Sequence, residues 1–283
     1  MPDELIPQQN TGVLIGQRPA DYVAGTLDYQ ARVPSGDWRP FLVTEERQYS
    51  HIADAMDCVS ESFTNVAEIQ HKQQTGKEIN FSARALAKLS GTTRNGNYLY
   101  KVADEARNFG LLLEEEWPTP PSFSWESFYA DIPVETLAKR RKYDIGYEWI
   151  ATDKGSLQYH LKHAPIQIII TKLNPNHAVT LVAIEGDTAF YFDSYPPHLK
   201  KIKLADLYGT AMKIVINAEQ TMKLIRDKGV VYMVAGVNNK VKTGIASPEV
   251  LAALFGDEPI EDGDTSSIPQ SQTASSGFII QKA

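Results

Sequence analysis

The order of two hydrophobic patterns along the chain limits its fold more than any other feature. Residues 57–74, 81–89 and 97–109 have the 3.6-residue period of helices. After about residue 165, short runs rich in Ile, Val and aromatic residues follow a helical stretch at 156–164, and they cover residues 166–173, 177–186, 188–195 and 212–218. Helices followed by strands are typical of α+β folds and not of alternating βαβ units, so we expect an α+β fold.

We divide the 283 residues into four regions. Residues 1–47 are rich in Pro, Gly and polar residues and are expected to be an extended lead-in. Residues 48–217 hold the helical and strand patterns and form the main domain. Residues 218–257 predict a small module of a hairpin, turning near Asn238 and Asn239, and a helix at 247–256. Residues 258–283 lack periodicity, which predicts a flexible polar tail.

Charge and composition exclude several classes of function. A net charge of -7 argues against general nucleic-acid binding. No apolar run approaches the roughly 20 residues that cross a bilayer, and the polar start MPDELIPQQN does not resemble a secretory signal. A single cysteine forms no internal disulfide and cannot alone build a thiolate zinc site. We therefore expect no metal, cofactor, nucleic-acid or membrane partner, and a reducing compartment.

That one cysteine, Cys58, lies in the first turn of the helix predicted at 57–74. Asp57 can cap this helix and Gly76 can end it. The unpaired N–H groups of a first turn stabilise a thiolate, which is the nucleophilic form. A lone cysteine is also often a buried filler, so the pattern alone leaves both interpretations open. A catalytic cysteine needs a base, and that base needs an orienting group.

Among the six histidines, His177 has the most informative position. It opens a strand directly after Asn-Pro-Asn, and the next strand, joined through Gly186 and Asp187, delivers Asp193. Adjacent strands can hold an imidazole beside a carboxylate, which makes these residues candidates for base and orienting group. His51 falls in a polar loop, and solvated positions are expected for the remaining helical histidines, His71, His160 and His163.

Five motifs over residues 35–217 resemble the papain-like cysteine peptidases, and the likeness is closest in character to bacteriophage-encoded members. GDWRPF resembles the entry to the mature domain, and MDCVSESFTNVAEI resembles the nucleophile helix. NFSARALAKLSG followed by GNYLYKVADEARNFGLLLEEEWP resembles the two helices that lead to the cleft, and SLQYHLKHAPIQIII resembles the helix and strand before the histidine. HAVTLVAIEGDTAFYFDSY resembles the histidine strand and its return strand. The Cys58–His177 separation is shorter than the about 130–150 residues usual in the family.

The resemblance implies a papain-like fold, with a helical half carrying Cys58 packed against an antiparallel β-rich half. Cys58 would attack a peptide carbonyl, His177 would exchange its proton, and Asp193 would orient the imidazole where the family has Asn. For the oxyanion hole the family uses a glutamine about six residues before the cysteine. Here Gln48, ten residues before Cys58, is the candidate, with His51 as the alternative.

The resemblance also marks departures from the family. Gly96 lies where the family binds substrate backbone, although a turn glycine without a binding role fits the pattern equally. Met56 and Asp57 replace the Gly-Ser that usually precedes the cysteine. A carboxylate beside Cys58 should oppose thiolate formation unless it turns away to cap the helix.

Three functions remain open. The first is a phage-encoded cysteine peptidase that hydrolyses protein or peptide substrates through a Cys58 thioester. The second is a structural or adaptor protein of a virion that keeps the papain-like fold with little or no activity and contacts other virion proteins. The third is a thiol hydrolase acting on peptidoglycan cross-links or isopeptides. The first two place the chain in the cytoplasm of an infected bacterial cell or in the virion.

Overall fold

The computed structural model describes residues 13–14, 31–171, 176–207 and 209–217, and four strands beyond them at 223–227, 230–235, 241–245 and 260–262. The chain forms two compact units, Met1–Ala218 and Glu219–Ala283. Each unit is described here by itself. Among the described residues, no helix has the length and apolar character needed to cross a membrane.

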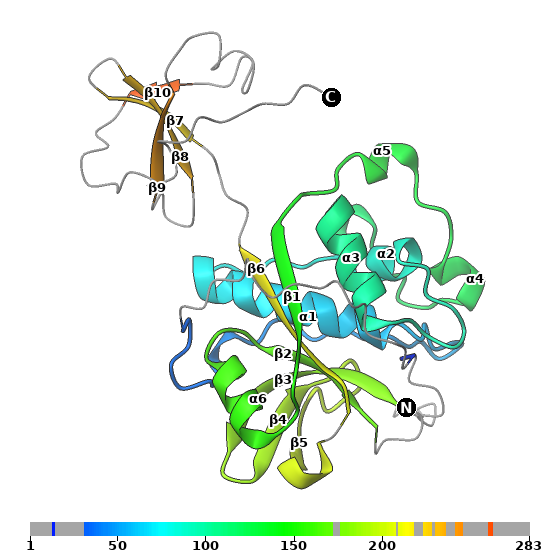
Figure 1. The fold of residues 1–283 in the computed structure, drawn as a ribbon. Helices are drawn as coiled ribbons and strands as arrows, with labels where there is room; N and C mark the ends of the chain where they lie inside the picture. Colours follow the sequence, from blue (N-terminus) through cyan, green and yellow to red (C-terminus); the bar gives the residue numbers. More distant parts are fainter. Residues whose placement is uncertain are drawn as a thin grey trace. The chain divides into compact units, whose positions relative to one another are not determined.

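The first half of the larger unit is helical, as predicted (Figure 1). The three predicted helices are α1 (Cys58–Thr75), α2 (Ala83–Leu89) and α3 (Leu99–Phe109). Ser82 caps α2 by accepting from the Ala85 N–H, and Gly76 ends α1 with a left-handed φ of 73°. Shorter helices connect these elements and precede the strands: η1 (Arg39–Phe41), η2 (Glu114–Glu116), α4 (Trp125–Phe128), α5 (Val134–Leu137), α6 (Lys154–Leu161) and η3 (Leu204–Asp206).

The second half is a six-stranded sheet in which all neighbouring strands are antiparallel, with the order β1-β6-β2-β3-β4-β5. Its strands are β1 (Asp144–Ile150), β2 (Ile166–Ile170), β3 (His177–Glu185), β4 (Thr188–Phe192), β5 (Leu199–Lys203) and β6 (Ala211–Asn217). The α+β prediction is therefore confirmed. Sequence patterns predicted β2, β3, β4 and β6 but missed β1 and β5.

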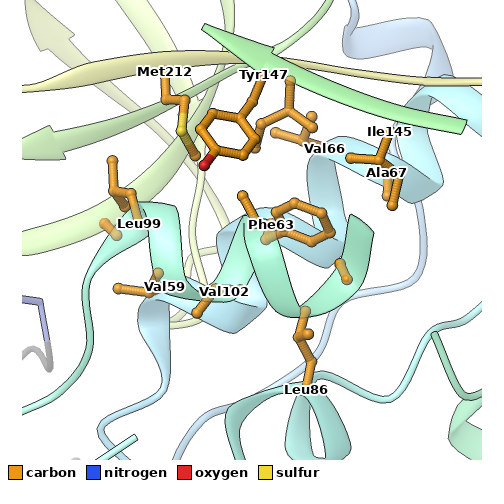
Figure 2. Close-up of a cluster of buried hydrophobic side chains, with 14 of the residues drawn as sticks. Val59, Phe63, Val66, Ala67, Leu86, Leu99, Val102, Ile145, Tyr147 and Met212 are labelled. Atoms are coloured by element: carbon orange, nitrogen blue, oxygen red, sulfur yellow. The ribbon is translucent and has the colours of Figure 1, made fainter. Parts of the chain in front are cut away.

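The main hydrophobic core lies between the helices and the sheet (Figure 2). The apolar stripe of α1 packs there through Val59, Phe63 and Val66, all fully buried, against residues of α2, α3, β1 and β6. A second cluster is built from residues of β2, β3, β4 and α6, and it includes Ile69 of α1 and Trp38. Because α1 contributes to both clusters, it is held between the two halves of the fold.

Polar side chains also attach α1 to the sheet. Gln167 of β2 donates through Nε2 to the Val59 carbonyl oxygen at 2.8 Å, and Thr180 of β3 donates to the Ser62 carbonyl oxygen at 3.0 Å. Buried hydrogen bonds of this kind are costly to leave unmade, so they define how the helix sits on the strands. They fix the start of α1 relative to the start of β3.

The smaller unit contains β7 (Lys223–Asp227), β8 (Val230–Ala235), β9 (Val241–Ile245) and β10 (Ile260–Asp262) in the sheet order β10-β7-β8-β9. β8 and β9 pair antiparallel, as the predicted hairpin requires. β10, which pairs parallel with β7, falls inside the segment that we predicted to be a flexible tail. The helix predicted at 247–256 and the rest of that tail lie outside the described residues.

Candidate active site

Cys58 is the first residue of α1 and is fully buried. The backbone N–H of Ala178, the residue after His177, faces the Cys58 thiol and favours its thiolate form. Both residues belong to the same buried cluster between the helices and the sheet. The fold therefore brings the only cysteine to the start of the strand that carries the candidate base.

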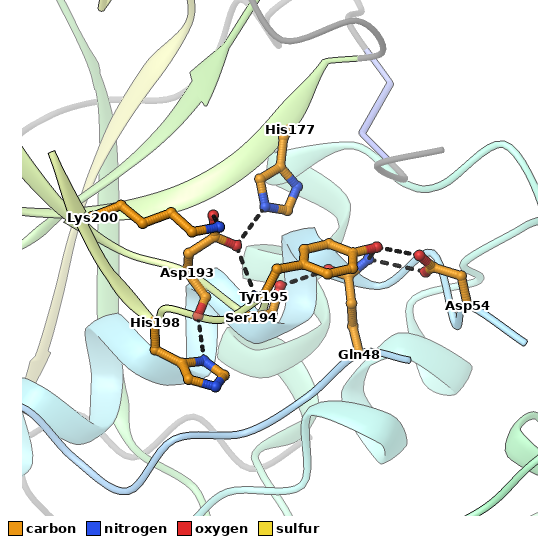
Figure 3. A network of polar contacts seen from close by, with 8 residues as sticks. All are labelled: Gln48, Asp54, His177, Asp193, Ser194, Tyr195, His198 and Lys200. Carbon is orange, nitrogen blue, oxygen red and sulfur yellow. Dashed lines mark hydrogen bonds and ion pairs between the residues drawn. The ribbon is translucent and has the colours of Figure 1, made fainter. Parts of the chain in front are cut away.

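His177 and Asp193 form a buried pair, and His177 directly precedes Ala178, whose N–H faces the thiol (Figure 3). The imidazole Nε2 lies 2.8 Å from Asp193 Oδ1, and both side chains are 1% exposed. Because a carboxylate only accepts, Nε2 carries the proton of the neutral ring, which leaves the lone pair on Nδ1. Within the described part of the chain, Nδ1 has no hydrogen-bond partner.

A β-bulge decides that this histidine and this aspartate share a face. Near the β3–β4 turn, Ala183 pairs with Phe190, but the register shifts by one residue so that Leu181 pairs with Tyr191 and Thr180 with Phe192. Continued by one residue, the shifted register places Asp193 opposite Val179, two residues from His177 and on the same face. Without the bulge, the two side chains would point to opposite faces of the sheet.

Tyr195 covers the pair from one side. Its ring lies 5.5 Å from the His177 ring, and it stacks on Tyr49 at 5.2 Å with an interplanar angle of 11°. Its backbone N–H donates to Asp193 Oδ1 at 3.0 Å, and its hydroxyl donates to Asp54 Oδ2. Burial raises the pKa of Tyr195, so the hydroxyl keeps its proton and remains a donor.

Gln48 is fully buried and links the loop before α1 to the Asp193 segment (Figure 3). Its Nε2 donates to Asp54 Oδ1 at 3.0 Å and to the Tyr195 hydroxyl oxygen at 2.9 Å, while its Oε1 accepts from the Ser194 hydroxyl at 2.6 Å. An amide NH₂ has two donors, and both are used here. The structure thus places the predicted oxyanion donor at the site but engages it in holding Tyr195 and Ser194.

Replacing Tyr195 by phenylalanine is expected to lower the free energy of unfolding by about 1–3 kcal/mol, because Asp54 and Gln48 each lose a buried hydrogen-bond partner. Urea unfolding monitored by fluorescence measures this loss. Tyr49→Phe is the matched control, since it keeps the stacked ring and is expected to change stability by less than about 0.5 kcal/mol. Equal effects of the two substitutions would show that the Tyr195 hydroxyl contributes nothing special.

Gly96 forms part of a tight turn with a φ of 88°. Its N–H donates to the Thr93 carbonyl oxygen at 2.7 Å, and its own carbonyl oxygen accepts from the Thr93 N–H at 3.1 Å. The adjacent carbonyl oxygen, that of Asn97, accepts from Leu14 of the lead-in at 2.7 Å, and Val13 packs in the core cluster that includes Cys58. Both the turn glycine and its neighbour therefore bond within the chain.

Comparison with solved structures identifies the architecture. The chain matches the proform of Amb a 11, a ragweed pollen cysteine protease, with a TM-score of 0.51 and 15% identity, over 64% of this chain and 66% of the ragweed chain, which is just under two thirds. It matches procathepsin L 3 of Tenebrio molitor with a TM-score of 0.51 and 15% identity, over 73% of this chain and 76% of that one. It also matches a Carica candamarcensis cysteine protease with a TM-score of 0.50 and 17% identity, over 64% and 98% of the two chains.

The chain has the papain-like fold. In comparisons with protein families and with curated proteins, nothing matches the chain. The solved structures come from plants and an insect, and all share less than a fifth of their residues with this chain. At this level of identity the match establishes the fold, and it does not establish an activity.

Within this papain-like fold, the surroundings of Cys58 favour its neutral thiol over its thiolate. Burial raises the pKa of Cys58 well above its ordinary value, and the nearby carboxyl groups of Asp57, Asp54 and Asp193 raise it further, while the Ala178 N–H opposes them. Deprotonation of Cys58 therefore requires a base at the site. Met56, two residues earlier, has a φ of 59°, so the chain is strained where the resembling family has glycine.

The prediction that Asp57 caps α1 with its side chain is wrong. Asp57 is fully buried, makes no side-chain capping hydrogen bond, and has no hydrogen-bond partner for either carboxyl oxygen among the described residues. Burial, together with Asp54, raises its pKa well above the ordinary value. The raised pKa favours the protonated form of Asp57, and whenever this carboxyl is ionised its charge raises the pKa of Cys58.

Asp57 belongs to a set of acidic side chains around α1 whose pKa values are all raised, first by burial and then mostly by one another. The set consists of Glu46, Asp57, Glu61, Glu68 and Glu114. Among the described residues, no group of three or more His, Cys, Asp or Glu side chains is placed to hold a metal ion.

The other histidines agree only in part with the sequence-based expectations. His163 is buried, so the prediction of a solvated position is wrong for it. His51 is exposed and lies 3.4 Å from the Ser122 hydroxyl. His198, which sequence reasoning left aside, donates through Nδ1 to the Asp193 carbonyl oxygen at 2.8 Å. The sequence did not predict Asp54 and Lys200 as site residues either, because only the folded chain brings them to the site.

Proposed function

We propose that the chain is a cysteine peptidase that hydrolyses peptide bonds of protein substrates through a Cys58 thioester. The observation that carries the proposal is the His177–Asp193 pair. His177 Nε2 lies 2.8 Å from Asp193 Oδ1, while Nδ1 has no hydrogen-bond partner in the described residues. The next residue, Ala178, directs its N–H at the Cys58 thiol. A nucleophile, a base and an orienting group in this order are what acyl transfer requires. The papain-like fold supports it as an analogy.

The chemistry follows from the positions of the protons. His177 Nδ1 takes the Cys58 thiol proton while Sγ bonds to the peptide carbonyl carbon, and the carbonyl oxygen becomes an oxyanion. The same Nδ1–H then gives its proton to the departing amine as the C–N bond breaks, leaving a thioester that water hydrolyses. Asp193 fixes the ring by accepting from Nε2 throughout. Gln48 is the proposed oxyanion donor, which requires one of its amide hydrogens to leave Asp54 or Tyr195.

A structural or adaptor role with little turnover remains the second candidate, since three observations favour it. Cys58 is fully buried, burial raises the pKa of its thiol, and both amide hydrogens of Gln48 are engaged. A bacteriophage origin, a place in a virion or an infected cell, and the action on isopeptides or peptidoglycan cross-links stay predictions. The plant and insect proteases matched above lend the phage origin no support.

Labelling of the native full chain with a peptidyl epoxide between pH 4 and 9 separates the two candidates. The peptidase proposal expects one label per chain at Cys58, faster than the reaction of a free cysteine at the same pH, and none in Cys58→Ser. A label that appears only after denaturation would contradict the peptidase proposal and favour the structural or adaptor role. Cleavage of a mixed peptide library then identifies the substrate.

A further inference from the structure

Asp193 has a second partner that the catalytic scheme does not use. Lys200 of β5 donates from Nζ to Asp193 Oδ2 at 2.8 Å, while His177 occupies Oδ1 (Figure 3). The Lys200 side chain is 18% exposed and the Asp193 side chain 1%. The carboxylate is thus shared between an imidazole on one oxygen and an ammonium on the other, away from bulk water.

The sheet register creates this arrangement. Lys200 pairs with Tyr191 across β4 and β5, and Asp193 lies two residues beyond Tyr191 on the same face. Diagonal neighbours of this kind are within reach of a long side chain such as lysine. His177 of β3, Asp193 directly after β4 and Lys200 of β5 therefore form a row, with the carboxylate in the middle.

Asp193 brings a negative charge to the place where the papain-like peptidases have the neutral amide of an asparagine. A lone aspartate would stabilise the imidazolium form of His177 and so retain the proton that the leaving amine must receive. A lysine on its other oxygen cancels most of that negative charge. Burial alone would raise the pKa of Asp193, but the His177 ring and the Lys200 ammonium hold it below its ordinary value, so the carboxylate stays ionised.

We propose that Lys200 is a positioning residue of this site, whose ammonium neutralises Asp193 so that the Asp193–Lys200 pair orients His177 as one uncharged group. The proposal rests on the proposed peptidase function, because it assigns Lys200 a part in proton transfer at the same site. Lys200 acts through Asp193, to which its Nζ donates.

Other titratable groups also face this row and must stay constant in any test. They come from the loop before α1, from α1, from β4 and from the β4–β5 connection, and they are Asp54, Cys58, Tyr191, Tyr195 and His198. None of them donates to Asp193 Oδ2 in the described residues, where Lys200 is the partner. Changes at Lys200 and Asp193 can therefore be compared with all of these groups in place.

A double-mutant cycle tests the proposal through the pH at which the His177 ring loses its proton. This pH is read by NMR of the imidazole in full-length Cys58→Ser protein, so the readout does not need activity. Lys200→Met exposes the ring to the full Asp193 charge and is expected to move that pH upward by about one unit. Asp193→Asn leaves the ammonium unbalanced and is expected to move it downward by a similar amount. The double variant should return close to the parent value.

Matched variants keep the test decisive. Lys201→Met removes an exposed charge from the opposite face of β5 and should leave the ring titration unchanged. Lys200→Arg retains the charge and should also behave like the parent, which separates loss of charge from loss of folding. The proposal is overturned if Lys200→Met leaves the titration unmoved, or if the double variant is no closer to the parent than Asp193→Asn alone.

With Cys58 restored, the basic limb of the kcat/KM profile should shift in parallel with the ring titration. If the native chain shows no hydrolysis and no labelling, the peptidase proposal fails, whereas the NMR cycle still decides whether Lys200 neutralises Asp193. The two failures are therefore distinguishable.

Discussion

Replacing His177 by alanine is expected to lower kcat/KM for peptide hydrolysis by about 10⁴-fold. The size of the loss follows from the state of the thiol. Burial and three neighbouring carboxyl groups raise the pKa of Cys58, so without the Nδ1 lone pair of His177 the thiol stays protonated at neutral pH. Steady-state kinetics on the peptide found in the library screen measure the loss.

Epoxide labelling of the same variant should become slow and rise only at alkaline pH, as for a buried thiol without a base. His71→Ala is the matched control, because His71 lies in the last turns of α1, far along the helix from Cys58, and contacts Thr75 and the Lys77 carbonyl oxygen. Its activity should stay within about twofold of the parent. A His177→Ala enzyme that remains as active as His71→Ala would remove His177 from the mechanism.

Local sequence patterns predicted the elements that carry this site. The apolar stripe from Val59 to Ile69 predicted α1, and the short runs that open at His177 and end near Asp193 predicted β3 and β4. Periodicity suffices here because α1 and β3 are buried over most of their length, so their hydrophobic pattern is strong. The resemblance then ordered these residues as nucleophile, base and orienting group.

Polar strands escaped prediction for a physical reason. β5 is Leu-Lys-Lys-Ile-Lys at the edge of the sheet, where lysine is favoured because it discourages pairing with other chains, and such a strand lacks a hydrophobic signature. In β1, Glu148 interrupts the apolar pattern because it pairs across the sheet with Lys213 of β6. In the sequence, a charged residue such as Glu148 suggests a loop, because the lysine that neutralises it becomes its neighbour only in the folded sheet.

The decisive details of the site depend on long-range contacts. The register shift between Leu181 and Ala183, which places His177 and Asp193 on one face, leaves no mark in residue type. The resemblance points to Gln48 as the glutamine that precedes the cysteine, but nothing in the sequence indicates its partners Ser194 and Tyr195, which lie almost 150 residues away. Nothing in residue type distinguishes Lys200 from Lys201 and Lys203 beside it, and only the β4–β5 register aligns it with Asp193.

The free energy of unfolding is expected to fall as the pH rises from about 4.5 through 7. The cause is the set of buried acidic side chains around α1, whose pKa values are raised by burial and by one another. A raised carboxyl pKa means that the folded chain holds protons that the unfolded chain has already released. Each such carboxyl group contributes its full stabilisation at pH values below its pKa in the unfolded chain. This contribution is lost as the pH rises through the pKa of the group in the folded chain.

Glu46 indicates the size of the stability change over this pH range. Burial and the Glu114 charge raise its pKa from 4.5 to about 7. This shift corresponds to about 3 kcal/mol lost between those pH values. Asp193 and Asp37, whose pKa values are lowered, act in the opposite direction, but only below about pH 4, where they take up protons. Urea unfolding at pH 4.5, 6 and 7.5 measures the slope.

Glu46→Gln isolates the contribution of one carboxyl group. The amide can keep the hydrogen bond to Asn80, carries no charge at any pH, and is expected to make the chain more stable than the parent at pH 7.5 while flattening the slope. Glu115→Gln, at an exposed position beside Glu114, is the control and should leave the slope as it was. If Glu46→Gln keeps the parent slope, Glu46 does not hold its proton through neutral pH. A stability that rises from pH 4.5 to 7.5 in the parent would contradict the raised pKa values of the whole set.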